Sequence, residues 1–167
     1  SKHMAAQGWN AVAIDWKGSR HTPRHGCIWA DLTTVAGEAT LWKTLQRPGV
    51  AQIHFGLPCG TGSKAREIPI SDKHKEMVAP EPRQLRSDAE PWGISEGLWP
   101  NEILKVTKAN QLVRLMVKVI LWAHAKGIKW TIENPANSRM WDLVAELLEL
   151  EGVLSIYYHA CMLGGKR

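Results

Sequence analysis

Cys59 lies in a segment whose composition suits a reactive thiol. Pro58 precedes it, and the small residues Gly-Thr-Gly-Ser occupy positions 60–63. Proline restricts the backbone before the cysteine, and the small residues leave space for a substrate to approach the sulfur. The pattern predicts that Cys59 is a nucleophile, since a thiolate forms covalent intermediates readily. The alternative is a buried cysteine that only fills the interior.

Glu133 is the second residue whose position suggests chemistry. It directly follows the apolar run 128–132 and precedes Asn134 and Pro135. A carboxyl group that is half buried at the end of a strand can stay protonated, so Glu133 is a candidate general acid. A carboxylate that caps the following helix is the alternative.

The elements that must position these residues alternate between short apolar strands and longer helical patterns. This alternation is typical of an α/β fold with a parallel sheet. Asn101 is predicted to cap the longest helix, and Gly127 is predicted to end it. The expected strands are 11–15, 27–31, 52–56, 128–132 and 153–158, and the expected helices are 34–46, 101–126 and 138–149.

The carboxyl ends of parallel strands share one edge of a sheet, which is where ligands bind in open α/β folds. Asp15, Asp31, Cys59 and Glu133 each end or follow a predicted strand. We therefore expect these four side chains to converge at that edge.

Residues 57–100 separate the third strand from the long helix and hold six of the nine prolines. A connection of this length is expected to be functional or mobile, so we predict a loop insertion at about 60–100. Its cations, Arg83 and Arg86 among them, are balanced by acidic residues. The mixed charges are expected to form a solvated surface.

The order of three motifs along the chain resembles that in the DNA cytosine-5 methyltransferases: Pro58-Cys59, then Ser63, then Glu133-Asn134. The resemblance implies a parallel-sheet, Rossmann-like S-adenosylmethionine-dependent methyltransferase fold. It also implies that Cys59 attacks carbon 6 of a flipped cytosine while Glu133 holds the ring at nitrogen 3. Charge stabilisation at that nitrogen favours addition of the thiolate, after which carbon 5 can accept a methyl group.

The resemblance extends to residues that would bind the cofactor, S-adenosylmethionine. Asp15-Trp16 resembles the family's acidic and aromatic pair, which binds the ribose and the adenine ring. Asp31-Leu32 resembles the next motif, whose aspartate accepts a hydrogen bond from the adenine amino group. The family likeness therefore implies an adenosine pocket lined by these four residues.

DNA is the partner that the resemblance implies, with RNA not excluded. Ser63 falls where the family has a serine that contacts DNA. Arg167 ends the segment 161–167, which resembles the start of the family's segment with a base-contacting arginine. Lys64 and Arg66 follow Cys59 closely and are expected to contact phosphates.

The sequence departs from the family at its cofactor loop and its recognition domain. The first strand with its Phe-x-Gly-x-Gly loop is absent, and no target-recognition domain follows Arg167. We expect residues 1–167 to be one partial methyltransferase-like domain with a gap between the strands at 11–15 and 52–56. Further segments of a longer parent chain, or a partner, are expected to fill that gap, because unpaired buried backbone groups are costly.

Two other functions remain open. The first is a degenerate, non-catalytic relative that acts as a nucleic-acid-binding or interaction module, which the missing cofactor loop favours. The second is an unrelated thiol enzyme in which Cys59 works with His54 or His159, although both histidines lie on predicted strands and are expected to be packed. Binding of S-adenosylhomocysteine would distinguish the methyltransferase hypothesis from these two alternatives.

Composition indicates which partners and which cellular compartment to expect. The net charge of +5 suits a polyanionic partner. The longest apolar run, 119–123, is too short for a membrane span, so no membrane partner is expected. Three widely spaced cysteines favour a reducing, intracellular compartment, which would be the nucleus in a eukaryote. His21, His25 and Cys27 have no evident fourth ligand, so no metal site is expected.

Overall fold

The structure, a computed structural model, describes residues 6–18, 26–72 and 82–159. It is a mixed α/β structure with small parallel sheets. Contacts within the chain divide it into two compact units, Ser1–Ile53 and His54–Arg167.

Among its described residues, the first unit contains a two-stranded parallel sheet and the helix α2. β1 (Ala13–Asp15) pairs with β2 (Cys27–Trp29) so that Asp15 lies opposite Trp29. α2 (Val35–Leu45) begins after Thr34, whose hydroxyl accepts a hydrogen bond of 3.1 Å from the backbone of Gly37. The predictions of these strands and of a threonine-capped helix are confirmed, with slightly shorter bounds.

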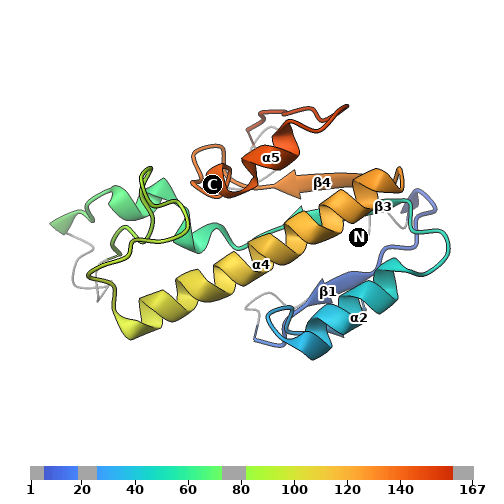
Figure 1. Cartoon of the computed structure of the whole chain (residues 1–167), viewed down its shortest axis with the longest axis horizontal. Helices are drawn as coiled ribbons and strands as arrows, with labels where there is room; N and C mark the ends of the chain where they lie inside the picture. Colours follow the sequence, from blue (N-terminus) through green and yellow to red (C-terminus); the bar gives the residue numbers. More distant parts are fainter. Residues whose placement is uncertain (1–5, 19–25, 73–81, 160–167) are drawn as a thin grey trace. The chain divides into compact units, whose positions relative to one another are not determined.

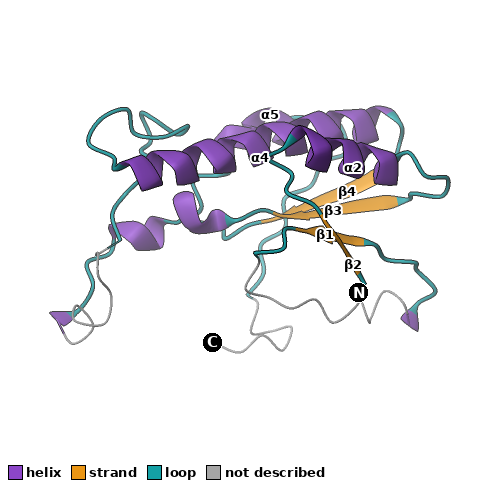
Figure 2. Ribbon diagram, turned by 90° about the horizontal axis from the view of Figure 1, so that it is seen from below, coloured by secondary structure: helices purple, strands orange, loops and turns teal. Residues whose placement is uncertain are grey.

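The second unit is built on another two-stranded sheet, in which β3 (Gln52–Gly56) pairs with β4 (Lys129–Glu133). α4 (Pro100–Ala125) runs beside β4, and α5 (Ala145–Leu148) lies next to it (Figure 1). Both helices lie on the same side of β3 and β4 (Figure 2). The predicted third and fourth strands and the long helix are therefore confirmed.

The core of the second unit lies between these helices and one face of the sheet. Burial alternates along β4, because Trp130 and Ile132 pack against the core while Lys129, Thr131 and Glu133 are exposed. Such alternation is typical of a sheet that is covered on one face only. The buried core residues are Val113, Met116, Ile120, Met140, Leu143, Val144 and Leu147.

The start of α4 differs from the prediction. The residue that caps the helix is Trp99 and not Asn101, because Pro100 occupies the first helical position, where its missing N–H costs nothing. The Glu102 carboxylate accepts a hydrogen bond of 2.9 Å from the backbone N–H of Trp99 and satisfies that donor. At the other end Gly127 has φ of +68°, a left-handed conformation that suits glycine, so its predicted role as the stop is confirmed.

The region after β4 contains less regular structure than predicted. The helix expected at 138–149 is limited to the 3₁₀ turn η3 (Asp142–Val144) and the single turn of α5. The strand expected at 153–158 is wrong, since the segment is irregular and Leu154, Ile156 and Tyr157 are 79–84% exposed. A strand needs a neighbour for its backbone hydrogen bonds, and no described strand pairs with this segment.

The four described strands form two separate sheets, β1 with β2 and β3 with β4. No pairing joins β1 to β3 in the described ranges. None of the described helices is both long enough and apolar enough to cross a membrane.

Candidate functional site

Cys59 lies in a short turn directly after β3. The 3₁₀ turn η1 (Cys59–Thr61) follows Pro58, whose φ is −58°. The turn is closed by a hydrogen bond of 3.0 Å from the backbone N–H of Gly62 to the carbonyl of Cys59. The thiol is free and half-buried, so it is neither sealed in the core nor held in a disulfide.

Glu133 is the last residue of β4, and its side chain is exposed. The expectation of a half-buried carboxyl group is therefore wrong for this structure, because Glu133 continues the solvent-facing alternation of β4. No hydrogen bond or ion pair engages its carboxylate among the described residues. The neighbouring Asn134 is turned inward instead, and its Oδ1 atom is buried without a hydrogen-bond partner.

The segments that follow β3 and β4 are joined through their backbones. The N–H of Arg139 donates a hydrogen bond of 2.8 Å to the carbonyl of Gly62. Ser63 and Ser138 form an isolated antiparallel bridge next to it. Gly62 is buried so closely that a Cβ atom there would lie 2.7 Å from Cγ of Met140. The structure thus holds the turn that contains Cys59 against the segment that follows Glu133.

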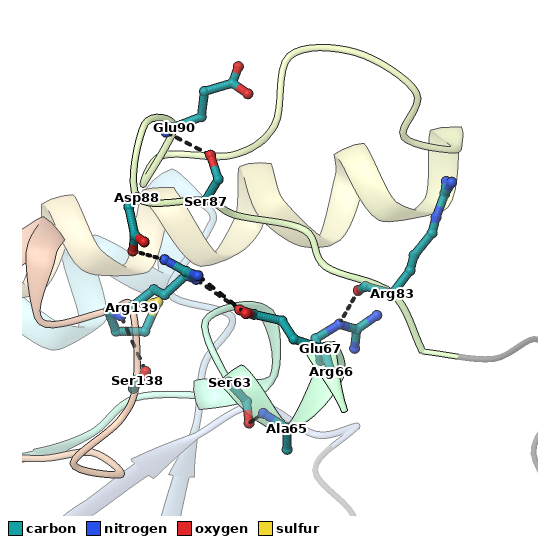
Figure 3. A network of polar contacts seen from close by, with 11 residues as sticks. Ser63, Ala65, Arg66, Glu67, Arg83, Ser87, Asp88, Glu90, Ser138 and Arg139 are labelled. Carbon is teal, nitrogen blue, oxygen red and sulfur yellow. Dashed lines mark hydrogen bonds and ion pairs between the residues drawn. The ribbon is translucent and has the colours of Figure 1, made fainter. Parts of the chain in front are cut away.

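The side chain of Arg139 strengthens the same junction (Figure 3). It is 7% exposed, and its Nε and Nη2 atoms donate to the two carboxylate oxygens of Glu67 at 3.0 and 3.3 Å. Its Nη1 atom forms an ion pair with Asp88. These hydrogen bonds, first to Glu67 and then to Asp88, raise the pKa of Arg139 above its usual value. The guanidinium therefore connects η2 (Lys64–Glu67), the loop containing Asp88 and the segment after β4.

Another ion pair fixes the loop at the start of α4. Arg83 pairs with Glu102, and its guanidinium carbon lies 4.3 Å from the centre of the Trp99 ring. The hydrogen bond from Arg83 lowers the pKa of Glu102 to about 2. Glu102 is 5% exposed, so it is a buried carboxylate whose charge is compensated.

Arg86 contradicts the expectation of a solvated charged loop. It is 1% exposed, and its Nε and Nη2 atoms donate to the hydroxyl of Thr61 at 3.2 and 3.1 Å. Charge counting could not identify this residue, because it treats all cations of a loop alike. The only sequence signal was its position after Leu85, which is also 1% exposed.

The residues expected to contact DNA differ in their solvent exposure and in their hydrogen bonds within the chain. Lys64 is exposed, whereas Ser63 is half-buried and accepts a hydrogen bond of 3.3 Å from the backbone of Ala65. Arg66 is folded back and donates to the carbonyls of Arg83 at 2.8 Å and Gly60 at 3.4 Å. Arg167 lies outside the described residues.

The residues expected to bind a cofactor belong to the first unit. Asp15 ends β1 and Asp31 follows β2, so both lie at the carboxyl edge of this parallel pair. The Trp16 side chain is 53% exposed, and its ring lies over Gly18. The Asp31 carboxylate accepts hydrogen bonds from the backbone and hydroxyl of Thr33 at 2.9 and 2.6 Å. Leu32, beside it, is half-buried.

The histidines of the alternative thiol enzyme are not packed as expected. His54 is exposed on β3, and its Nδ1 atom lies 2.9 Å from the hydroxyl of Thr131 on β4. His159 is also exposed. No contact in the described part of the chain links either imidazole to Cys59.

Metal-binding side chains do not gather within the described ranges, since no group of three or more His, Cys, Asp or Glu residues there is arranged to hold an ion. His21 and His25 lie outside these ranges.

Comparisons with known proteins found no relative of this chain. No family model matches the chain, and no curated protein or solved structure matches it significantly.

Proposed function

We propose that this chain is a DNA cytosine-5 methyltransferase-like domain with a Rossmann-like fold. In this proposal Cys59 is the nucleophile, Glu133 binds the cytosine ring, and a methyl group passes from S-adenosylmethionine to carbon 5. The chemistry requires a thiol and a carboxyl group that reach the same ring from two chain segments.

One observation carries the proposal: the hydrogen bond between Arg139 and Gly62, reinforced by the bridge between Ser63 and Ser138, joins the two segments concerned. Cys59 lies three residues before Gly62, and Glu133 lies five residues before Ser138.

The residues of the first unit fit the adenosine half of S-adenosylmethionine. Trp16 presents an exposed ring for stacking on adenine, and the half-buried carboxylate of Asp15 can accept hydrogen bonds from ribose hydroxyls. Asp31 and Leu32 would complete this pocket. S-adenosylmethionine, when bound, supplies an electrophilic methyl group.

The proposed reaction at the second unit consists of addition of a thiolate to the cytosine ring, methylation and elimination. The Cys59 thiolate forms a bond to carbon 6 of cytosine, and the electron pair of the 5,6 double bond moves to carbon 5. The Glu133 carboxyl group donates a hydrogen bond to ring nitrogen 3, where negative charge develops. The electron pair at carbon 5 would then form the bond to the methyl group, and the cofactor would leave as the thioether S-adenosylhomocysteine. A base such as water removes the proton from carbon 5 and the thiolate leaves, which restores the double bond.

Covalent capture tests this proposal directly. The 167-residue chain is incubated with S-adenosylmethionine and mixed-sequence duplexes that contain 5-fluorocytosine, whose fluorine cannot leave as a proton does. We expect the wild-type chain and the control Cys27→Ser to form a denaturation-resistant adduct. Cys59→Ser should form none, and Glu133→Gln should form it at least about 100-fold more slowly, a typical loss for a missing acid.

Two results would overturn the proposal. Adduct formation by Cys59→Ser would remove the nucleophile assigned here. A wild-type chain that binds these duplexes without forming an adduct would favour the non-catalytic binding module instead.

A further inference from the structure

Arg86 is the largest of the fully buried side chains among the described residues. Two of its nitrogen atoms, Nε and Nη2, donate to the same oxygen, the Thr61 hydroxyl, at 3.2 and 3.1 Å. A third nitrogen, Nη1, donates to the carbonyl of Pro91 at 2.7 Å. All the acceptors of this guanidinium are therefore neutral.

Arg86 has no counter-ion among the described residues, unlike Arg83 and Arg139. Arg83 pairs with Glu102, and Arg139 pairs with Glu67 and Asp88. Within the described ranges no carboxylate pairs with Arg86, and burial lowers its pKa to about 10. It remains charged at neutral pH, and a buried charge without a counter-ion is costly for stability.

Thr61 connects this buried guanidinium to the proposed nucleophile. Thr61 is the last residue of η1, and Cys59 is the first. The hydrogen bond from Gly62 to the Cys59 carbonyl closes the turn, so the orientation of Thr61 and that of Cys59 are coupled through three consecutive residues. Gly60, between them, has open space around it and contributes no packing of its own.

We propose that Arg86 is a positioning residue that fixes the Thr61 hydroxyl and thereby orients the turn that presents the Cys59 thiol. The catalytic meaning of this role rests on the proposed function, but the orientation of the thiol can be measured without DNA or cofactor. An apolar residue at position 86 would avoid the cost of burying a charge, but it could not donate the hydrogen bonds that fix Thr61.

Alkylation of Cys59 by iodoacetamide is the test, performed on the full chain with Cys27→Ser and Cys161→Ser. Thr61→Val removes the acceptor oxygen and keeps the shape, whereas Thr61→Ser keeps the oxygen. We expect Thr61→Val and Arg86→Met each to raise the second-order rate constant at least threefold, because the loosened turn exposes the half-buried thiol. Thr61→Ser should remain within twofold of the parent.

The double variant separates positioning from unrelated effects. If both groups act through their shared hydrogen bonds, Thr61→Val combined with Arg86→Met should react no faster than either single variant. Ile120→Val, a core truncation on α4, is the control for a general loss of stability and should leave the alkylation rate unchanged. Thermal unfolding of every variant is measured in parallel.

Three results would overturn this inference: equal alkylation rates for Thr61→Val and Thr61→Ser, multiplicative effects in the double variant, or the same acceleration in Ile120→Val. If Arg86→Met does not fold, the comparison of Thr61→Val with Thr61→Ser still decides. The covalent capture of DNA provides an independent readout, in which Thr61→Val should be slower than Thr61→Ser. A wild-type chain that captures no DNA while the alkylation pattern holds would refute the proposed function and leave the positioning role intact.

Discussion

The backbone N–H of Arg139 donates a hydrogen bond of 2.8 Å to the carbonyl of Gly62, across 77 positions of the chain. This bond joins the segment after β3 to the segment after β4, whose strands are already neighbours in the sheet. Cys59 and Glu133 belong to those two segments. Changes at Gly62 and Arg139 therefore test how tightly the candidate site is held.

Gly62→Ala should disrupt this junction. A Cβ atom at position 62 would lie 2.7 Å from Cγ and 3.1 Å from the backbone nitrogen of Met140, so the two segments would have to move apart. We expect a loss of about 1–3 kcal/mol in the free energy of unfolding, as for other overpacked sites, measured by urea titration. Covalent capture of DNA should also become at least tenfold slower.

Gly60→Ala is the matched control for that change. It lies in the same turn, but no atom lies within 4 Å of a Cβ atom at position 60 and its φ is not positive. Its stability should be unchanged or higher by about 0.4–1 kcal/mol, because alanine restricts the unfolded chain. Equal losses in the two variants would show that the turn tolerates no side chain at all and that the contact with Met140 is irrelevant.

Arg139→Gln should destabilise the second unit by roughly 1–3 kcal/mol, because the variant loses charge-assisted hydrogen bonds to Glu67 and Asp88. Arg139→Lys should recover only part of this loss, since lysine keeps the charge but cannot donate two parallel hydrogen bonds. The exposed Arg47, replaced by glutamine, is the control and should change stability by less than about 0.5 kcal/mol. Full recovery in Arg139→Lys would mean that charge alone, without the forked geometry, holds the junction.

Glu102 should make stability depend on pH in the acid range. Its pKa is lowered from 4.5 to about 2 in the folded chain, chiefly by the hydrogen bond from Arg83. A carboxylate with a depressed pKa stabilises the fold above pH 4.5, and this stabilisation is lost as the pH falls from 4.5 towards 2. The difference in unfolding free energy between wild type and Glu102→Gln should therefore be roughly 1–3 kcal/mol at pH 7 and shrink below pH 4.5.

Urea titrations between pH 7 and pH 3 measure this difference. Glu96→Gln, at an exposed position before α4, should give a stability profile parallel to that of the wild type. A difference between wild type and Glu102→Gln that stays constant down to pH 3 would contradict the role of the charged carboxylate.

The sequence predicted best those elements whose signals are local. α4 and α2 follow helical periodicity with clear end signals, and β3 has the bounds that its composition indicated. The error at Asn101 has a local cause too, because the preference of proline for the first helical turn outweighs the capping preference of asparagine. Here two local rules competed, and the sequence alone did not rank them.

The parts that the sequence could not predict depend on distant partners. The backbone N–H groups of Ser138 and Arg139 donate to the carbonyls of Pro135 and Gly62, and so residues 138–141 do not form the expected first turn of a helix. The burial of Arg86 depends on Thr61, 25 positions earlier, and the exposure of Glu133 depends on which face of β4 meets the core. Propensity and charge patterns contain no information about such pairings.

Binding of the cofactor product is the remaining prediction, and it concerns the first unit. S-adenosylhomocysteine should bind to residues 1–167 weakly, since these residues contain no Phe-x-Gly-x-Gly loop to hold the amino-acid part. Asp15→Ala should weaken binding by about 10- to 100-fold, the loss expected when a hydrogen-bonding carboxylate is removed. Intrinsic tryptophan fluorescence is the readout, because the Trp16 side chain is 53% exposed beside Asp15.

Two tryptophan variants show which tryptophan produces the change in fluorescence. Trp16→Phe should retain binding in a calorimetric titration but lose most of the fluorescence change, since stacking on adenine would alter the emission of that ring. Trp9→Phe, at another exposed tryptophan, should retain both. If Asp15→Ala binds as tightly as the wild type, the adenosine pocket proposed at the carboxyl edge of β1 and β2 is wrong. If Trp16→Phe keeps the full fluorescence change while Asp15→Ala loses binding, the carboxylate assignment stands and the stacking assignment fails.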